Sequence, residues 1–182
     1  GMDRSIIIGD LVVQNLFAAE NEVFSLVGQF DELSTNYYDL ISLLPDILGP
    51  KLPEQLAELG DVRGEGLAVV TNNSVDTDMV LTSDLGRVQV DMMLDNLDIA
   101  EEATYRGTIR ATNFNVGRLT QVPDLGRTSF RLDLEGKGFT TESLSTELNG
   151  LIANLRFNGY TYRDLKVLGT LNAPVFNGDL IS

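Results

Sequence analysis

Apolar and polar residues alternate almost without a break between Thr82 and Leu180. In the segment 88–94 apolar side chains stand at every second position, and the same alternation returns in the segment 130–135. Because successive side chains of a β-strand point to opposite faces, this period of two predicts a sheet with one apolar and one polar face.

The alternating region also repeats a short motif. Asp84-Leu85-Gly86-Arg87 recurs as Asp124-Leu125-Gly126-Arg127, and a strand pattern follows each copy. We expect both copies to form turns, with Gly86 and Gly126 at positive φ and the two arginines on the polar face. A role for Arg87 or Arg127 in gripping a phosphate headgroup is the less favoured alternative.

Turn-forming residues divide this part of the chain into segments of about ten residues. The turn signals are Asn72-Asn73, Asp95-Asn96, Gly136-Lys137-Gly138, Asn149-Gly150, Asn158-Gly159 and Asn177-Gly178. The strands predicted between them cover 62–71, 75–83, 87–94, 104–112, 128–135, 144–149, 151–158, 160–171 and 174–181. Such short intervals favour antiparallel pairing, since a parallel crossover needs a dozen residues or more.

The first third of the chain differs in its pattern. Residues 5–30 hold two apolar runs separated by the segment 18–22, which predicts strand, turn and strand. Residues 35–60 change to a helical period, interrupted by Pro45 and ended by Gly60. The residues expected on the apolar faces of two short helices are Tyr37, Leu40, Ile41, Leu44, Leu52, Leu56 and Leu59.

The whole chain, residues 1–182, is therefore expected to be a single β-groove unit in three parts. Strands over 5–30 come first, a helical cap or insert over 35–60 follows, and repetitive antiparallel strands fill 62–181. We expect the helical part to cap one end of the apolar sheet face.

Two architectures could cover the apolar face. One is a closed β-sandwich, in which a second sheet packs on the first. The other is an open, curved, U-shaped sheet, a β-taco or groove with an apolar inner face. The modular repeat favours the open sheet, and the short helical segment is too small to roof about ten strands. We predict an all-β antiparallel fold with a short helical insert and an open groove, with the sandwich as the alternative.

Composition excludes several classes of function. Of 182 residues, 43% are hydrophobic, which argues against disorder, and a net charge of −14 argues against nucleic acid and anionic lipid surfaces as partners. The chain has no His and no Cys, so it lacks the familiar nucleophile–histidine pairs, and Gly64-Glu65-Gly66 is no phosphate-binding loop. Acidic turns such as Asp76-Thr77-Asp78 lack EF-hand spacing. We expect that the protein is not an enzyme and that it binds neither a cofactor nor a metal ion.

Targeting features are equally sparse. No run reaches the roughly 18–20 apolar residues of a membrane span, and no signal peptide begins the chain. Gly1 before Met2 has the form of a tag remnant, and the segment 178–182 stops within a strand pattern. We expect the chain to be a piece of a longer protein.

Three stretches resemble recurrent segments of TamB proteins, the AsmA-related subunit of the periplasmic translocation-and-assembly module. They are Gly107–Leu119, then Phe130–Phe139 with Leu148-Asn149-Gly150, and Leu155–Leu165 running into Val167–Leu171 and Phe176–Leu180. Together they cover residues 80–181, with a looser echo at 35–66, and their form is closest to the Bacteroidota type. None is a catalytic signature, so specificity depends on their order along the chain.

The resemblance implies a periplasmic protein of the cell envelope whose parent is anchored in the inner membrane. Such proteins carry a long U-shaped β-sheet and are linked to phospholipid transport and to outer-membrane protein assembly. Neither the anchor nor a segment matching the partner-binding C-terminus is present here. Contacts with the outer-membrane assembly machinery would use parts of the parent outside this chain.

An apolar groove suits acyl chains on physical grounds, since a strand of about seven residues spans roughly 23 Å, comparable to an extended acyl chain. The partner would then be phospholipid acyl chains, or alternatively unfolded outer-membrane protein strands held by β-augmentation. A structural β-domain with a closed core is the third interpretation. The candidate groove residues are Val88, Val90, Met92, Leu94, Ile109, Phe130, Leu132, Leu134, Leu148, Leu155, Phe157, Val167 and Leu171.

Overall fold

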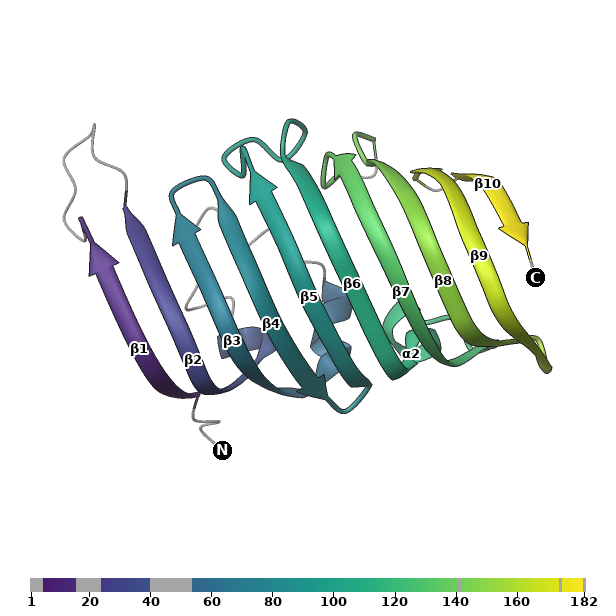
Figure 1. The fold of residues 1–182 in the computed structure, drawn as a ribbon, viewed down its shortest axis with the longest axis horizontal. Helices are drawn as coiled ribbons and strands as arrows, with labels where there is room; N and C mark the ends of the chain where they lie inside the picture. Colours follow the sequence, from purple (N-terminus) through teal and green to yellow (C-terminus); the bar gives the residue numbers. More distant parts are fainter. Residues whose placement is uncertain (1–4, 16–23, 40–53, 141, 174, 182) are drawn as a thin grey trace.

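Ten strands form a single antiparallel sheet in the computed structural model, which describes residues 5–15, 24–39, 54–140, 142–173 and 175–181 (Figure 1). The strands follow one another in chain order across the sheet. They are β1 (Ile6–Gln14), β2 (Ser25–Asn36), β3 (Asp61–Thr71), β4 (Val75–Ser83), β5 (Gly86–Asp95), β6 (Thr104–Asn115), β7 (Leu125–Lys137), β8 (Ser145–Phe157), β9 (Tyr160–Asn172) and β10 (Val175–Ile181). Two short helices accompany them, η2 (Glu54–Leu59) and α2 (Val116–Thr120), and residues 37–39 are also helical.

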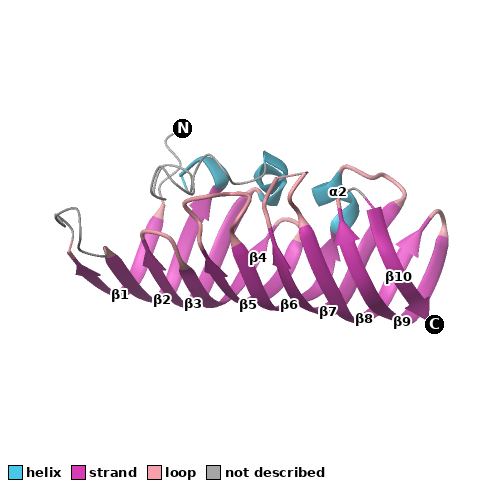
Figure 2. Cartoon of the chain, turned by 90° about the horizontal axis from the view of Figure 1, so that it is seen from above, coloured by secondary structure: helices cyan, strands magenta, loops and turns pink. Residues whose placement is uncertain are grey.

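The sheet is open and curved. Among the described residues β1 pairs only with β2 and β10 only with β9, so the two edges do not meet. Figure 2 shows the curvature and places the short helices on the concave side. The predicted open, curved antiparallel sheet is confirmed, and the alternative of a closed sandwich is wrong because all ten strands belong to one sheet.

Cross-strand register fixes which residues share a face. Val90 of β5 pairs with Ile109 of β6, which pairs with Leu132 of β7. One position along, Asp91 pairs with Thr108, and the Thr108 hydroxyl donates to Asp133 Oδ1 at 2.7 Å. Because directly paired residues lie on the same face, the inner face is apolar and the outer face polar.

Little of the apolar surface is deeply buried. The accessible surface is 11487 Å² for a chain of 19.9 kDa, against about 8,700 Å² expected for a compact monomer of that mass. The largest fully buried side chains are Leu85 and Leu97, and most inner-face residues are only half-buried. The sheet is stabilised mainly by the backbone hydrogen bonds between its strands and by side-chain packing between neighbouring strands.

Two of the expected turns are wrong. Asn149-Gly150 lies within β8, where the sequence predicted a break between two strands, and Asn177-Gly178 lies within β10. Gly150 pairs with Leu132 and Val167, and a Cβ there would come within 2.1 Å of the Arg131 carbonyl oxygen. This glycine permits a close approach of two strands, which a turn signal resembles in sequence.

Helix is not confined to residues 35–60, as the sequence predicted, because α2 lies between β6 and β7. Its N-cap is Asn115, whose Oδ1 accepts from the backbone N–H of Arg118 at 3.1 Å. In the N-terminal part, Asn36 caps residues 37–39 by accepting from Tyr38 N and Asp39 N. The predicted turn at 18–22 and the helix faces at Leu40, Ile41, Leu44 and Leu52 lie outside the described residues.

Candidate functional site

The inner face of β3–β10, which we call the trough, carries the predicted groove residues. Val88, Val90, Met92 and Leu94 alternate along β5 with the polar-face residues. The others join them through direct pairing or through alternation along a paired strand: Ile109 on β6, Phe130, Leu132 and Leu134 on β7, Leu148, Leu155 and Phe157 on β8, and Val167 and Leu171 on β9. The structure therefore brings all thirteen onto one surface.

One row of paired residues crosses the trough without a polar side chain. It runs through Met79, Val90, Ile109, Leu132, Gly150, Val167 and Leu180. Six strand spacings of about 4.8 Å make this row roughly 29 Å long. Since the row runs perpendicular to the strands, an apolar path continues from β4 to β10.

The trough residues are only partly covered. Met92 and Val167 are buried, Phe157 is 43% exposed, and the other ten predicted groove residues are half-buried by their neighbours. No second sheet covers this face among the described residues. An apolar molecule lying along the trough could contact these side chains without unfolding any part of the sheet.

Glycines on the inner face allow the strands to approach closely. At Gly107 of β6, where φ is +152°, a Cβ would lie 2.0 Å from the Asp91 carbonyl oxygen and 2.8 Å from Met92 Sδ. A side chain at this position would therefore displace β5. Glycine here keeps the trough floor continuous between Met92 and Leu134, which both pair with it.

The helices η2 and α2 lie over one set of strand ends of the trough, across β3–β7, and partly enclose an apolar cavity of about 280 Å³. Helix residues Leu56, Leu59 and Leu119 form one wall of this cavity. The sheet supplies the remainder: Val62, Leu81, Ser83, Gly86, Val88, Val90, Ile109, Phe114 and Phe130. The predicted capping by Leu56 and Leu59 is thus observed.

The cap is anchored on a small core that the sequence did not reveal. Leu85, Ala111 and Phe114 are buried together, and Leu59 and Val116 pack against them. Leu85 belongs to the tetrapeptide interpreted as a turn, and Phe114 follows a register shift in β6. The sequence did contain a signal for the start of α2, because Asn115 is a residue type that favours the N-cap position and stands three residues before Arg118.

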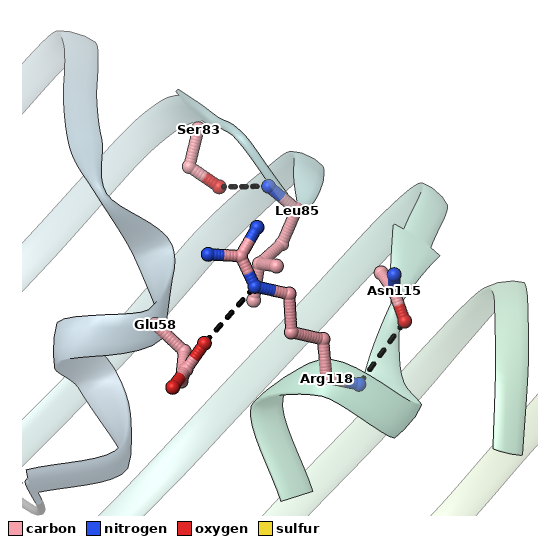
Figure 3. Close-up of polar contacts among 5 residues, drawn as sticks. All are labelled: Glu58, Ser83, Leu85, Asn115 and Arg118. Carbon is pink, nitrogen blue, oxygen red and sulfur yellow. Dashed lines mark hydrogen bonds and ion pairs between the residues drawn. The ribbon is translucent and has the colours of Figure 1, made fainter. Parts of the chain in front are cut away.

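Polar contacts tie the cap together on its outer side (Figure 3). Arg118 Nε donates to Glu58 Oε2 at 3.0 Å, which joins α2 to η2. Nearby, Ser83 Oγ accepts from Leu85 N at 3.3 Å and donates to the Gly86 carbonyl oxygen. The polar groups close to the cavity therefore form hydrogen bonds with one another.

The repeated tetrapeptides differ in their local structure. Gly86 has a φ of +140°, as expected, whereas Gly126 is not among the positive-φ glycines and the predicted conformation there is wrong. Arg127 Nη1 donates to the carbonyl oxygens of Leu85 at 3.0 Å and Asn113 at 2.6 Å, so it ties the second copy to the first. Arg87 Nη2 lies 3.8 Å from Glu65 Oε1, and both side chains are exposed.

Loops join the strands at the rim of the sheet opposite to η2 and α2. Leu97 N donates to the Asn73 carbonyl oxygen at 2.9 Å, and Gly138 N donates to that of Ala103 at 2.8 Å. Tyr105 stacks on Phe139 with ring centroids 5.4 Å apart. Hydrogen-bonded loops thus fix the relative positions of the strand ends at this rim.

Further chemistry is sparse in the described part of the chain. No three carboxylates there gather closely enough to hold a metal ion. None of the helices described is both long and apolar enough to span a membrane.

Comparisons with known proteins identify no relative: no protein-family model, no curated protein and no solved structure matches this chain. The class that the structure defines is an open antiparallel β-trough with a capped end. The resemblance to TamB proteins stays a prediction from the sequence.

Proposed function

We propose that this chain is a length of apolar trough that holds phospholipid acyl chains and passes them along, as part of a TamB-like protein of the periplasm. The observation that carries the proposal is the row from Met79 to Leu180, which is apolar and has no second sheet over it among the described residues. The outer face, in contrast, is lined with charged and polar side chains.

The energetics favour such a ligand. Each methylene moved from water to an apolar surface contributes about 0.8 kcal/mol, so a chain of a dozen contributes on the order of 10 kcal/mol before costs. Association costs an estimated 4–15 kcal/mol, so the gain from burying the acyl chain and the cost of binding it are of similar size. A carrier needs such a balance, because a ligand that binds too tightly does not move on.

Charge limits how the chain meets a membrane. The net charge of −14 disfavours adsorption of this part of the protein to anionic lipid. Lipid would therefore be delivered to the trough by other parts of the parent or by a partner, as the periplasmic proposal requires.

The test is native mass spectrometry, combined with lipid extraction, on the chain purified from a bacterial periplasm without detergent. Co-purified phospholipid in near-stoichiometric amount supports the proposal. Protein that emerges bare, and that also fails to take up phospholipid from neutral vesicles, overturns it.

A second function is favoured by the edge strand β1. All nine residues of β1 are exposed, and among the described residues one side of its backbone has no partner strand. An extended segment of an unfolded outer-membrane protein could add to this edge by β-augmentation. Binding of a synthetic outer-membrane β-strand peptide, abolished by Leu11→Pro but unaffected by a trough substitution, would favour this scaffold function over transport.

A further inference from the structure

The cavity beneath η2 and α2 differs from the rest of the trough because it has walls on opposite sides. Leu56, Leu59 and Leu119 face the sheet residues Val88 and Phe130 across it. Apart from the helical turn at 37–39, no other helix of the described residues lies on this side of the sheet (Figure 2). The capped part is thus a partly enclosed compartment that continues directly into the open trough.

We propose that this cavity binds the methyl end of an unbranched acyl chain, whose remainder lies along the trough. The inference rests on the proposed function, since it assigns a position and a direction to the same ligand. It assigns the tail to the η2–α2 end and the headgroup to a place outside the cavity.

The polarity of the walls selects the tail over the headgroup. Every lining side chain except Ser83 is apolar, and the Ser83 hydroxyl is already engaged with Leu85 N and the Gly86 carbonyl oxygen. Glu58 and Arg118 pair with each other on the outer side of the cap. A phosphate or carboxylate pushed into this cavity would lose its hydration without gaining a partner.

The size and continuity of the cavity select a chain. Its volume of about 280 Å³ is close to twice that of the ~150 Å³ apolar cavity that accepts benzene, which leaves room for roughly ten carbons of a chain. Val90 and Ile109 line the cavity and also belong to the apolar row of the trough. One flexible chain can therefore occupy both, whereas a rigid ring system would be confined to one of them.

The decisive experiment is photo-crosslinking of the unmodified protein with two hexadecanoic acid probes, followed by peptide mapping. One probe carries a diazirine at its methyl end, and the other carries it next to the carboxylate. We expect the methyl-end probe to label η2, α2 and the first half of β5, and the carboxylate-end probe to label other segments.

The outcomes separate the two proposals. Methyl-end labelling that spreads evenly over β6–β9 overturns the assignment of the cavity but leaves the trough function standing. Absence of labelling on the inner face with either probe overturns both.

A matched pair of variants tests the same assignment by filling space. Val90→Phe places a ring in the cavity, whereas Leu148→Phe enlarges a trough residue that does not line it. If the ring displaces about two methylenes, methyl-end labelling of η2 and α2 should fall about tenfold in Val90→Phe. It should be unchanged in Leu148→Phe, and equal labelling in the two variants would contradict the assignment.

Discussion

Arg118 of α2 donates from Nε to Oε2 of Glu58 in η2 at 3.0 Å, so an ion pair joins two helices that lie sixty positions apart in the sequence. Both helices also contribute leucines to the cavity at the capped end of the trough. The contact therefore connects two separate insertions of the β-meander into one cap.

We expect Glu58→Gln to loosen the cap without unfolding the sheet. The two side chains are 36% and 50% exposed for Glu58 and Arg118, and exposed ion pairs of this kind contribute about 0–1 kcal/mol. Urea unfolding should show a loss within that range, while amide exchange in residues 54–59 becomes faster. A loss of more than about 2 kcal/mol would mean that the pair supports the fold as a whole.

Leu85→Ala should be much more costly. Leu85 is fully buried with Ala111 and Phe114, beneath Leu59 and Val116. Truncation of such a leucine costs about 2–5 kcal/mol in unfolding free energy. The control is Leu168→Ala on the outer face, where 59% of the residue is exposed and the expected change is within about 0.5 kcal/mol.

The importance of Leu85 shows where sequence reasoning stopped. The alternation of apolar and polar residues located the strands from β3 to β10, because one face of the sheet is apolar and the other is exposed to solvent. That signal is local in the sequence. The partners of Leu85 come from η2, β5, β6, α2 and β7, so its burial depends largely on chain segments brought together only by the fold. Helix α2 is five residues long, which is too short to display a helical period.

Glycine was a misleading signal for a related reason. In the sequence, Asn149-Gly150 and Asn158-Gly159 look alike, but only the second forms a turn. Gly150 is required by a neighbouring strand, whereas a Cβ on Gly159 would meet nothing within 4 Å. The dipeptide alone does not distinguish a backbone conformation from a steric requirement.

Two glycine substitutions should separate these two requirements. Gly159→Ala costs only its left-handed backbone conformation, at φ +82°, about 1 kcal/mol. Gly107→Ala adds a clash with the Asp91 carbonyl oxygen at 2.0 Å and should cost at least about 2 kcal/mol. Equal losses in urea unfolding would contradict the close approach of β5 and β6.

The edge strand β1 should make the isolated chain associate with itself. Ile6, Ile8 and Val12 are each 47–52% exposed at an edge whose backbone has no partner among the described residues, and such edges promote pairing between molecules. Val12→Lys should lower the mass measured by light scattering at high concentration. Gln89→Lys adds the same charge on the polar face and should leave that mass unchanged.

An inward charge in the trough distinguishes an open surface from a closed core. Leu132 is half-buried between Ile109 and Gly150 on the inner face. In a closed core, Leu132→Asp would bury an unpaired charge at a cost of several kcal/mol, against a total stability of about 5–15 kcal/mol. In an open trough the carboxylate stays hydrated, so the protein should remain folded and lose its bound phospholipid. Phe157→Glu, at a residue already 43% exposed, should remain folded for the same reason.

Thermal melting and bound phospholipid should be measured on the same samples, with Asn154→Asp as the control. Asn154 lies on the outer face opposite Arg163, so the control adds the same charge without touching the trough. We expect the control to retain both fold and lipid. If Leu132→Asp unfolds while Asn154→Asp does not, the inner face is a closed core in solution and the transport proposal fails. If both variants stay folded and retain phospholipid, the lipid is bound elsewhere than on the trough.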